Sequence, residues 1–294
     1  MAEMIARRRC DHRRDRRSFA SSTRSPPRYT PPMPPPGRPA PALARAAALV
    51  AVAFLVLPLV GLAARAPWGR AGDVLRAPAT LDAFRLSLVV STTATAFSFV
   101  FGFPLGWWLA RGGGRAMAVV RPVVLLPLVL PPVVGGVGLL AALGRRGIVG
   151  AWLARLGIHL PFTTTGAILA ATFVSLPLVA LAVEGGFRAL DPRFEDAAAA
   201  MGASRGYTLR RVTLPLLGAQ VAAGLALGWA RALGEFGATI TFAGNLQGRT
   251  QTLPLAVYEL LQTDPDAAIV VSLILVVVAA AVLIILHRRL FGAA

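Results

Sequence analysis

Six long apolar segments divide the chain and constrain its fold more than any other feature. They run at about residues 42–63, 85–110, 118–143, 163–186, 216–242 and 267–287. A hydrocarbon core about 30 Å thick needs about 20 helical residues to span it, so each segment is long enough to cross a bilayer. Lipid offers no partner to a free backbone N–H or C=O group, whereas a helix satisfies both internally. The sequence therefore predicts an all-α polytopic membrane protein with six transmembrane helices.

The composition of these segments predicts which helices lie inside the bundle. The second to fifth contain Gly, Pro, Ser and Thr, which are tolerated where helices pack against each other rather than against lipid. In the third segment, Pro131, Pro132, Gly135 and Gly136 predict a kinked interior helix. The last segment is almost purely aliphatic over residues 269–286, which predicts a helix that faces lipid.

Residues 1–41 differ in composition from everything that follows. They are rich in Arg, Pro and Ser and have almost no apolar residues to bury, which predicts a disordered cytoplasmic tail. The arginines of this tail could contact nucleic acid or anionic lipid. We expect membrane lipid, and not nucleic acid, as the partner, because such a tail helps to fix topology. The rest divides into a first transmembrane helix at 42–63 and a main transmembrane domain at 80–290.

The distribution of arginine predicts the orientation of the chain in the membrane. Arginine-rich segments stay in the cytoplasm. The loop at 188–211 holds five arginines, against one, Arg249, in the loop that follows the next helix. With the N-terminal tail inside, both termini and the 188–211 loop are expected in the cytoplasm.

The composition also argues against a nucleotide site and a metal site. All 30 basic residues are Arg, and a P-loop needs a Lys on the nucleotide phosphates, so the chain has no Walker A site. If ATP drives the protein, a partner subunit binds the ATP and its Mg²⁺. Cys10 is the only cysteine, and His12, His159 and His287 are scattered without ligand spacing. We therefore expect no cofactor or metal site in this chain and no enzyme activity of its own.

One polar stretch, residues 191–215, lies between two apolar segments and is too polar to sit in the bilayer. Asp191 and Pro192 predict a helix start, and Gly202 predicts its end in the left-handed conformation. A second short helix is expected from about 204 to 212, and Pro215 should stop it. The result is a helix–Gly–helix knuckle outside the membrane, whose run at 197–200 offers a small-residue face to a partner's cleft. The alternative is an ordinary amphipathic loop.

The spacing within this knuckle resembles the EAA loop of binding-protein-dependent ABC importer permeases. Asp196-Ala197-Ala198, then Gly202, then Val212-Thr213-Leu214-Pro215 stand where that family has Glu-Ala-Ala, Gly and Ile-x-Leu-Pro. Asp and Val replace the Glu and the Ile, and Glu195 stands directly before the motif. The resemblance implies a type I importer permease, in which this loop is a cytoplasmic coupling helix that docks into a separate ATPase subunit. It implies coupling roles for Glu195, Asp196, Ala197, Ala198, Gly202 and Ala203.

The fifth apolar segment carries two charges, Arg231 and Glu235, spaced i to i+4 on the expected helix. A charge at the bilayer centre costs at least about 2.5–3.5 kcal/mol, so such residues usually pair and face a cavity. The two residues could form a gate or pathway element for an anion, or a structural ion pair. Thr239, Thr241 and Asn245 could add donors to an anion pathway, although Thr on apolar helices often bonds to its own backbone.

The string from 231 to 256, with GEFGATITFAGN and GRTQTLPLA, is similar to molybdate-transport permeases, as is the stretch at 130–138. The resemblance implies the permease subunit of an ATP-driven ABC importer of molybdate in the bacterial inner membrane. The implied partners are a second copy in a homodimer, two ABC ATPase subunits, and a periplasmic or lipoprotein molybdate-binding protein.

Other functions stay open at this point. A sulfate/thiosulfate or tungstate permease would have the same architecture. A stand-alone secondary transporter would not need an EAA loop. A membrane-bound enzyme lacks support, because no nucleophile–base pair or acidic catalytic pair stands in an accessible loop.

Overall fold

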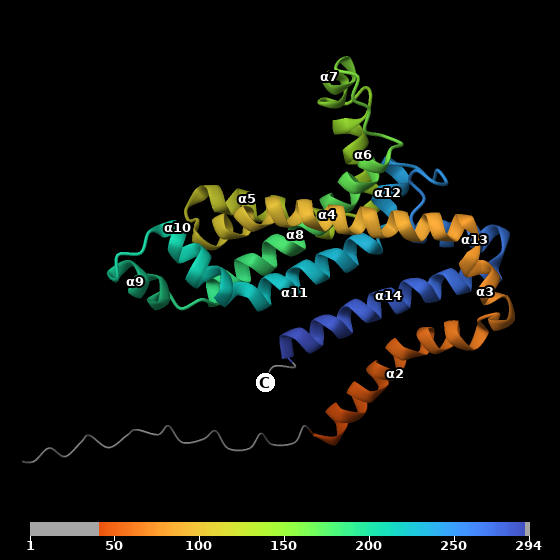
Figure 1. Cartoon of the computed structure of the whole chain (residues 1–294), viewed down its shortest axis with the longest axis horizontal. Helices are drawn as coiled ribbons and strands as arrows, with labels where there is room; N and C mark the ends of the chain where they lie inside the picture. The colour runs from red at the N-terminus through yellow and green to blue at the C-terminus, as the bar shows by residue number, and fades with distance from the viewer. Residues whose placement is uncertain (1–40, 292–294) are drawn as a thin grey trace, which may run out of the picture. The chain divides into compact units, whose positions relative to one another are not determined.

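The computed structural model describes residues 41–291, and every regular element in that range is helical (Figure 1). The all-α prediction is confirmed. The predicted tail at 1–41, apart from Pro41, lies outside the described residues, as do Cys10 and His12. The helices are α2 Ala42–Arg65, α3 Trp68–Arg76, α4 Pro78–Arg111, α5 Arg115–Val129, α6 Pro132–Leu143, α7 Gly150–Arg155, α8 Thr164–Ala189, α9 Arg193–Ala200, α10 Arg205–Thr208, the π-helix η1 Leu209–Thr213, α11 Leu214–Leu233, α12 Gly237–Phe242, α13 Leu253–Thr263 and α14 Pro265–Phe291.

Five helices are long and apolar enough to cross a membrane alone: α2, α4, α8, the continuous stretch Arg205–Leu233, and α14. Helices α5 and α6 meet at an angle of 117° and together make a sixth candidate span. The break lies at the predicted kink. The residue before a proline is driven into extended backbone, and Leu130 and Pro131 have ψ angles of 137° and 131°.

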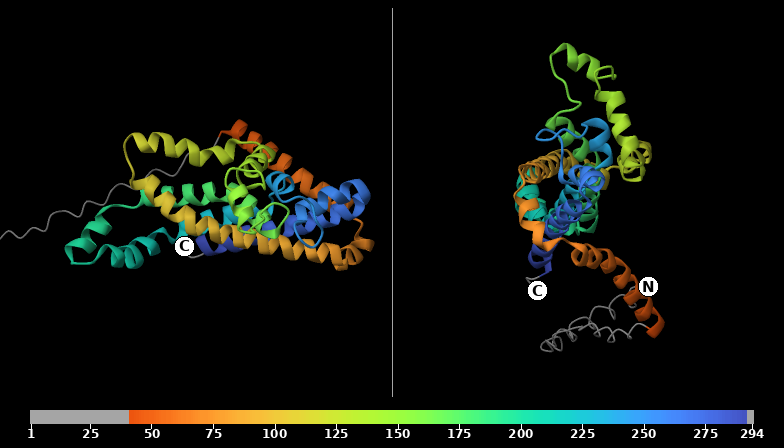
Figure 2. Two further views of the ribbon diagram at one scale, coloured as in Figure 1. Left: turned by 90° about the horizontal axis from the view of Figure 1, so that it is seen from above. Right: turned by 90° about the vertical axis from the view of Figure 1, so that its right-hand side faces the viewer.

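The prediction that the third apolar segment is an interior helix is wrong for the described residues. Only Met117 is buried in α5, and only Gly135 and Gly136 are buried in α6. Helices α6 and α7 extend away from the bundle formed by α4, α8 and α11 (Figures 1 and 2). The two glycines make close contacts with different helices. A Cβ at Gly136 would lie 2.6 Å from the Cβ of Thr241 in α12, and a Cβ at Gly135 would lie 2.9 Å from the ring of Phe173 in α8. Most of the valines on the two helices are exposed, namely Val119, Val123, Val129, Val133, Val134 and Val137.

The core of the bundle lies where α8 packs against α4 and α11. Small residues let the backbones approach closely, as is usual for helices that pack in a membrane. A Cβ at Gly106 of α4 would lie 2.4 Å from the carbonyl oxygen of Ala180 in α8. On the same interface, the hydroxyls of Ser98 and Ser175 are 2.8 Å apart and share a buried hydrogen bond. By contrast, the aliphatic α14 is mostly exposed within the described residues, as its composition predicts.

Two short helices, α3 and α13, lie at the end of the bundle opposite α9 and α10 (Figure 1). Arg70 of α3 donates to Asp264 over 3.0 Å, which ties α3 to the start of α14. The Ala267 N–H also donates to Asp264 over 3.1 Å, so Asp264 caps α14. Chiefly because of this backbone hydrogen bond, and then because of Arg70, the pKa of Asp264 lies below its usual value.

The fifth apolar segment is two helices rather than the single predicted helix. Helix α11 ends at Leu233 and α12 begins at Gly237. Two causes act at the break: Gly234 is a weak helix former, and the buried Glu235 carboxylate accepts the Ala238 N–H over 2.7 Å. That bond satisfies a backbone donor at the start of α12, so the new helix begins with its own cap.

Candidate functional site

The polar stretch predicted as a knuckle forms a helix, a glycine turn and a second helix. The Asp191 carboxylate accepts the Arg193 N–H over 2.9 Å, so α9 begins one residue later than predicted. After α9, Gly202 has a φ of +81°, as predicted. The Ala203 N–H then bonds to the carbonyl of Ala198 over 3.0 Å, which satisfies a terminal carbonyl of the helix. We call residues 191–215 the coupling knuckle from here on, after the role that its resemblance to the EAA loop implies.

The second half of the coupling knuckle does not end at Pro215, and this prediction was wrong. Helix α10, capped by the Ser204 hydroxyl, continues through η1 into α11 without a break. The Leu214 N–H bonds five residues back, to the carbonyl of Leu209. This wider turn gives room for the proline ring, and Pro215 lies in the first turn of α11, where proline is tolerated.

The far surface of the coupling knuckle is apolar and small. Ala198 faces inward and is buried, while Ala197, Ala199 and Ala200 are exposed. Three larger apolar side chains around them are exposed as well: Phe194, Met201 and Tyr207. Sequence reasoning did not single out these three, although apolar residues within a polar stretch are a usable signal for a partner surface.

Glu195 and Asp196, the two candidate acids of the motif, have different environments. The Glu195 carboxylate forms an ion pair with Arg111, the last residue of α4, and accepts the Thr213 hydroxyl over 3.0 Å. The side chain of Asp196 is exposed and forms no ion pair with any described residue. Both acids line the cavity beside the end of α4, but only Glu195 is tied to the bundle by polar contacts, whereas the exposed Asp196 carboxylate forms no ion pair within the described residues.

A cavity of about 910 Å³ lies between the end of α4 and the coupling knuckle. Trp107, Trp108 and Arg111 line it from α4, while Glu195 and Ala203 are among the knuckle residues that line it. Where this cavity lies, the side chains of the knuckle do not pack directly against α4.

The charged pair of the fifth segment is an ion pair in the structure. Arg231 and Glu235 contact each other, although Glu235 lies beyond the end of α11. One carboxylate oxygen of Glu235 meets Arg231 and the other accepts the Ala238 N–H, so both oxygens are occupied. The side chain of Glu235 is 1% exposed and that of Arg231 is 32% exposed. This geometry fits the structural interpretation better than a gate with a free charge.

Of the three other pathway candidates, Thr241 and Asn245 have donors that are already used within the fold. Thr239 is buried. The Thr241 hydroxyl donates to the carbonyl of Gly237 over 2.7 Å, which is the local backbone bond considered for it. The Asn245 amide donates to Glu259 over 2.9 Å, while its carbonyl oxygen is buried without a partner among the described residues.

A second ionic group, which sequence reasoning missed, joins three helices near the coupling knuckle. The buried Glu184 of α8 pairs with Arg121 of α5 over 2.8 Å and with Arg188 over 3.1 Å. Arg121 also donates to the carbonyl of Leu109 in α4 over 3.2 Å. Only the i, i+4 spacing of Glu184 and Arg188 was visible in the sequence, because the other contacts join residues far apart in the chain.

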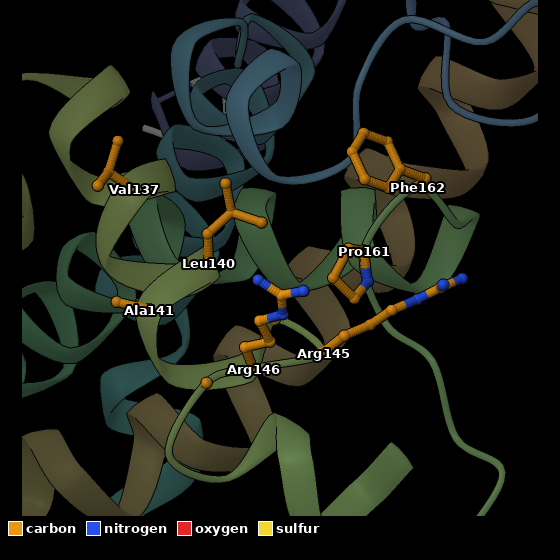
Figure 3. A pocket seen from close by; sticks show the side chains of 9 residues that line it. Val137, Leu140, Ala141, Arg145, Arg146, Pro161 and Phe162 are labelled. Carbon is orange, nitrogen blue, oxygen red and sulfur yellow. The ribbon is translucent and has the colours of Figure 1, made fainter.

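A separate cavity of about 690 Å³ lies at the end of α6, on the predicted outer side. Arg145 and Arg146 extend along its wall beside Pro161 (Figure 3). Both are exposed, and neither forms an ion pair within residues 41–291. Phe162, which also lines the cavity, has a φ of +59°, unusual for a residue with a side chain. The cavity offers positive charge to an anion or to an acidic surface.

Comparison with known proteins identifies relatives over most of the chain. Residues 102–292 match the family described as "Binding-protein-dependent transport system inner membrane component". The chain is 46% identical over 226 residues to the "Molybdenum transport system permease protein ModB" of Mycobacterium tuberculosis, a match that covers 77% of this chain and 86% of that protein. It is 33% identical over 224 residues to the "Sulfate transport system permease protein CysT" of Escherichia coli, covering 74% and 81% respectively.

Solved structures show the same fold. A bacterial alginate ABC transporter in complex with an alginate pentasaccharide-bound periplasmic protein contains a chain that matches with a TM-score of 0.67. The match covers 84% of this chain and 94% of its counterpart, at 16% sequence identity. The predicted ABC importer fold is therefore confirmed at the level of architecture.

Proposed function

The chain belongs to the family of binding-protein-dependent transport system inner membrane components, and we propose on this premise that it is the membrane subunit of an ATP-driven molybdate importer. The observation that carries the proposal is the similarity to a molybdenum permease over most of both chains. The lower identity to a sulfate permease supports molybdate over sulfate, which remains the second candidate together with tungstate.

We propose four kinds of contact for this subunit. Two copies form the pore, because each chain carries one coupling knuckle. Two ABC ATPase subunits, which bind ATP and Mg²⁺, dock on the two knuckles from the cytoplasm. A periplasmic or lipoprotein substrate-binding protein delivers the anion from outside, and lipid surrounds the remaining helices. Both termini then lie in the cytoplasm.

The exposed surface of the coupling knuckle supports the ATPase contact. Its alanines give a smooth helix face, and Phe194, Met201 and Tyr207 add apolar area that water would otherwise cover. Asp196 adds one exposed charge. When ATP closes the ATPase dimer, the knuckle moves with it and exchanges an inward-open for an outward-open pore. ATP has to favour one of the two states for this exchange to occur.

Deleting this chain should abolish high-affinity uptake of labelled molybdate in cells that otherwise contain the whole importer. The reason is that no other subunit provides the membrane path. We would measure uptake with and without the chain, with tungstate and sulfate as competitors. Competition by tungstate and not by sulfate is the expected result. If cells without the chain lose sulfate uptake and keep molybdate uptake, the substrate is sulfate. If neither uptake changes, the assignment of an oxyanion substrate is contradicted.

Purification of the tagged chain should recover an ATPase subunit in a one-to-one ratio. A stand-alone secondary transporter would purify without it, so this measurement separates the two classes directly. If the ATPase co-purifies but the wild-type complex takes up no oxyanion, the protein is an ABC importer of a different substrate.

Replacing Gly202 by valine should uncouple ATP hydrolysis from transport while the protein still inserts. The φ of +81° at Gly202 is costly for a β-branched residue, by about 1–2 kcal/mol or more, so the turn that closes α9 would distort. We expect at least about a ten-fold loss of uptake per ATP hydrolysed. Gly206→Val is the matched control, because Gly206 lies in α10 and a Cβ there meets open space. Normal transport by Gly202→Val would contradict the role of the turn.

A further inference from the structure

We propose that Glu195 is a positioning residue that links the coupling knuckle to the transmembrane helices, whereas Asp196 beside it faces the ATPase. This inference rests on the proposed function, because it describes how movement of the ATPase reaches the pore. It assigns different roles to Glu195 and Asp196, either of which could correspond to the Glu of the EAA motif.

The first observation is that Glu195 joins three elements at one carboxylate. It belongs to α9, its Oε2 pairs with Arg111 at the end of α4, and its Oε1 accepts the Thr213 hydroxyl at the end of η1. Thr213 is 1% exposed and leads directly into α11. One side chain therefore connects the knuckle to the two helices that flank α8 in the bundle.

The second observation is that little else connects the knuckle to α4. The cavity of about 910 Å³ separates much of α9 and α10 from the last two turns of α4. Glu195 and Arg111 both line this cavity, and their ion pair crosses it. Loss of this ion pair should therefore let α9 move relative to α4, although α9 stays packed against η1 and α10.

The third observation is that Arg111 is itself held in place. Its guanidinium lies 5.9 Å from the centre of the Phe187 ring, in reach of a cation–π interaction. Phe187 is buried in α8 and stacks on Trp107 of α4 with ring centres 5.9 Å apart. Arg111 therefore presents a fixed charge to Glu195 instead of following it freely.

The fourth observation extends the link to α5. Arg121 donates to the carbonyl of Leu109, two residues before Arg111, and pairs with the buried Glu184 of α8. A displacement passed from Glu195 to the end of α4 is thus shared with α5 and α8. The two polar groups are joined through the last turn of α4, which carries both Leu109 and Arg111.

Variants of Glu195 should fail in coupling rather than in assembly. The test uses the full complex of permease and ATPase in liposomes, with the substrate-binding protein and molybdate. Glu195→Gln keeps the size of the side chain and an acceptor for Thr213 but removes the ion pair. We expect the number of ATP molecules hydrolysed per anion transported to rise about five-fold, the change that loss of one partly exposed ion pair produces. The ATPase should still co-purify.

Two further variants make the test specific. Exchange of the charges, Arg111→Glu with Glu195→Arg, restores the ion pair but not the acceptor for the Thr213 hydroxyl, so it should return the ratio part of the way to the wild-type value. Arg70→Gln is the matched control, because Arg70 forms an exposed ion pair with Asp264 at the opposite end of the molecule. Asp196→Asn should instead weaken recovery of the ATPase. An unchanged ratio in Glu195→Gln would overturn the inference.

A distance measurement separates this inference from the proposed function. Spin labels at Ala200→Cys and Val100→Cys, both exposed positions, would report how firmly α9 is held to α4 in the full chain after Cys10→Ser. Glu195→Gln should broaden the distance distribution, and the charge exchange should narrow it again. A wild-type complex that transports no oxyanion would overturn the proposed function alone. An unchanged distribution in Glu195→Gln would overturn the link, whatever the substrate.

Discussion

Replacing Gly106 by alanine should destabilise the protein by about 2 kcal/mol, within the usual cost of overpacking a core. The new Cβ would lie 2.4 Å from the Ala180 carbonyl oxygen and 2.8 Å from the Cβ of Val183. Neither atom belongs to the flexible end of a side chain, so α4 and α8 would have to separate. Alanine gains about 1 kcal/mol of helix propensity over glycine, which offsets only part of this cost.

The matched control for this prediction lies one turn earlier on the same helix. At Gly102 the nearest atoms to a new Cβ are 3.4 Å away, at the edge of ordinary contact. Gly102→Ala should therefore leave stability unchanged or raise it slightly. The measurement is the midpoint of thermal unfolding in detergent for both variants. Equal midpoints would show that the close approach of α4 and α8 at Gly106 is not a constraint on folding.

The sequence predicted the membrane spans well because hydrophobicity is a local property. The expected segments at 42–63, 163–186 and 267–287 correspond to α2, α8 and α14 within a few residues at each end. The spans that were misjudged are those whose ends are set by specific contacts. Helix α4 begins at Pro78, seven residues or so before its apolar run, and α11 stops at Leu233 because Glu235 caps the next helix.

The coupling knuckle shows the same division between local and distant causes. The turn at Gly202 was predictable, because a positive φ has a strong residue preference. The choice between Glu195 and Asp196 was not, because it depends on Arg111, which lies 84 residues away in the chain. The prediction that Pro215 ends the second helix was wrong because the sequence carries no signal for the π-helix that accommodates the proline.

Helices α5 and α6 illustrate a limit of composition. Glycine and proline predicted an interior helix, yet only Met117, Gly135 and Gly136 are buried in these two helices. Composition reports what a helix tolerates and not which neighbour it has. In the proposed homodimer, this exposed apolar surface is available to a second copy of the chain.

Replacing Glu235 by glutamine should destabilise the protein by about 2–4 kcal/mol, because it leaves the partly buried Arg231 without a counter-charge. Glutamine keeps an acceptor for the Ala238 N–H, so the loss reports the charge rather than the cap. Thermal unfolding of the purified chain would measure it. The double variant Arg231→Met with Glu235→Gln removes both charges and should recover most of the stability.

Transport by that double variant decides between the two interpretations of the pair. If Arg231 and Glu235 only fix the break between α11 and α12, the double variant should import molybdate at near wild-type rate, because both charges are gone and the geometry remains. If the anion uses the charge of Arg231, the double variant should be stable and yet inactive. We expect the first result, because both carboxylate oxygens of Glu235 are occupied and its side chain is 1% exposed. A charge that is already neutralised within the fold has little attraction left for a passing anion.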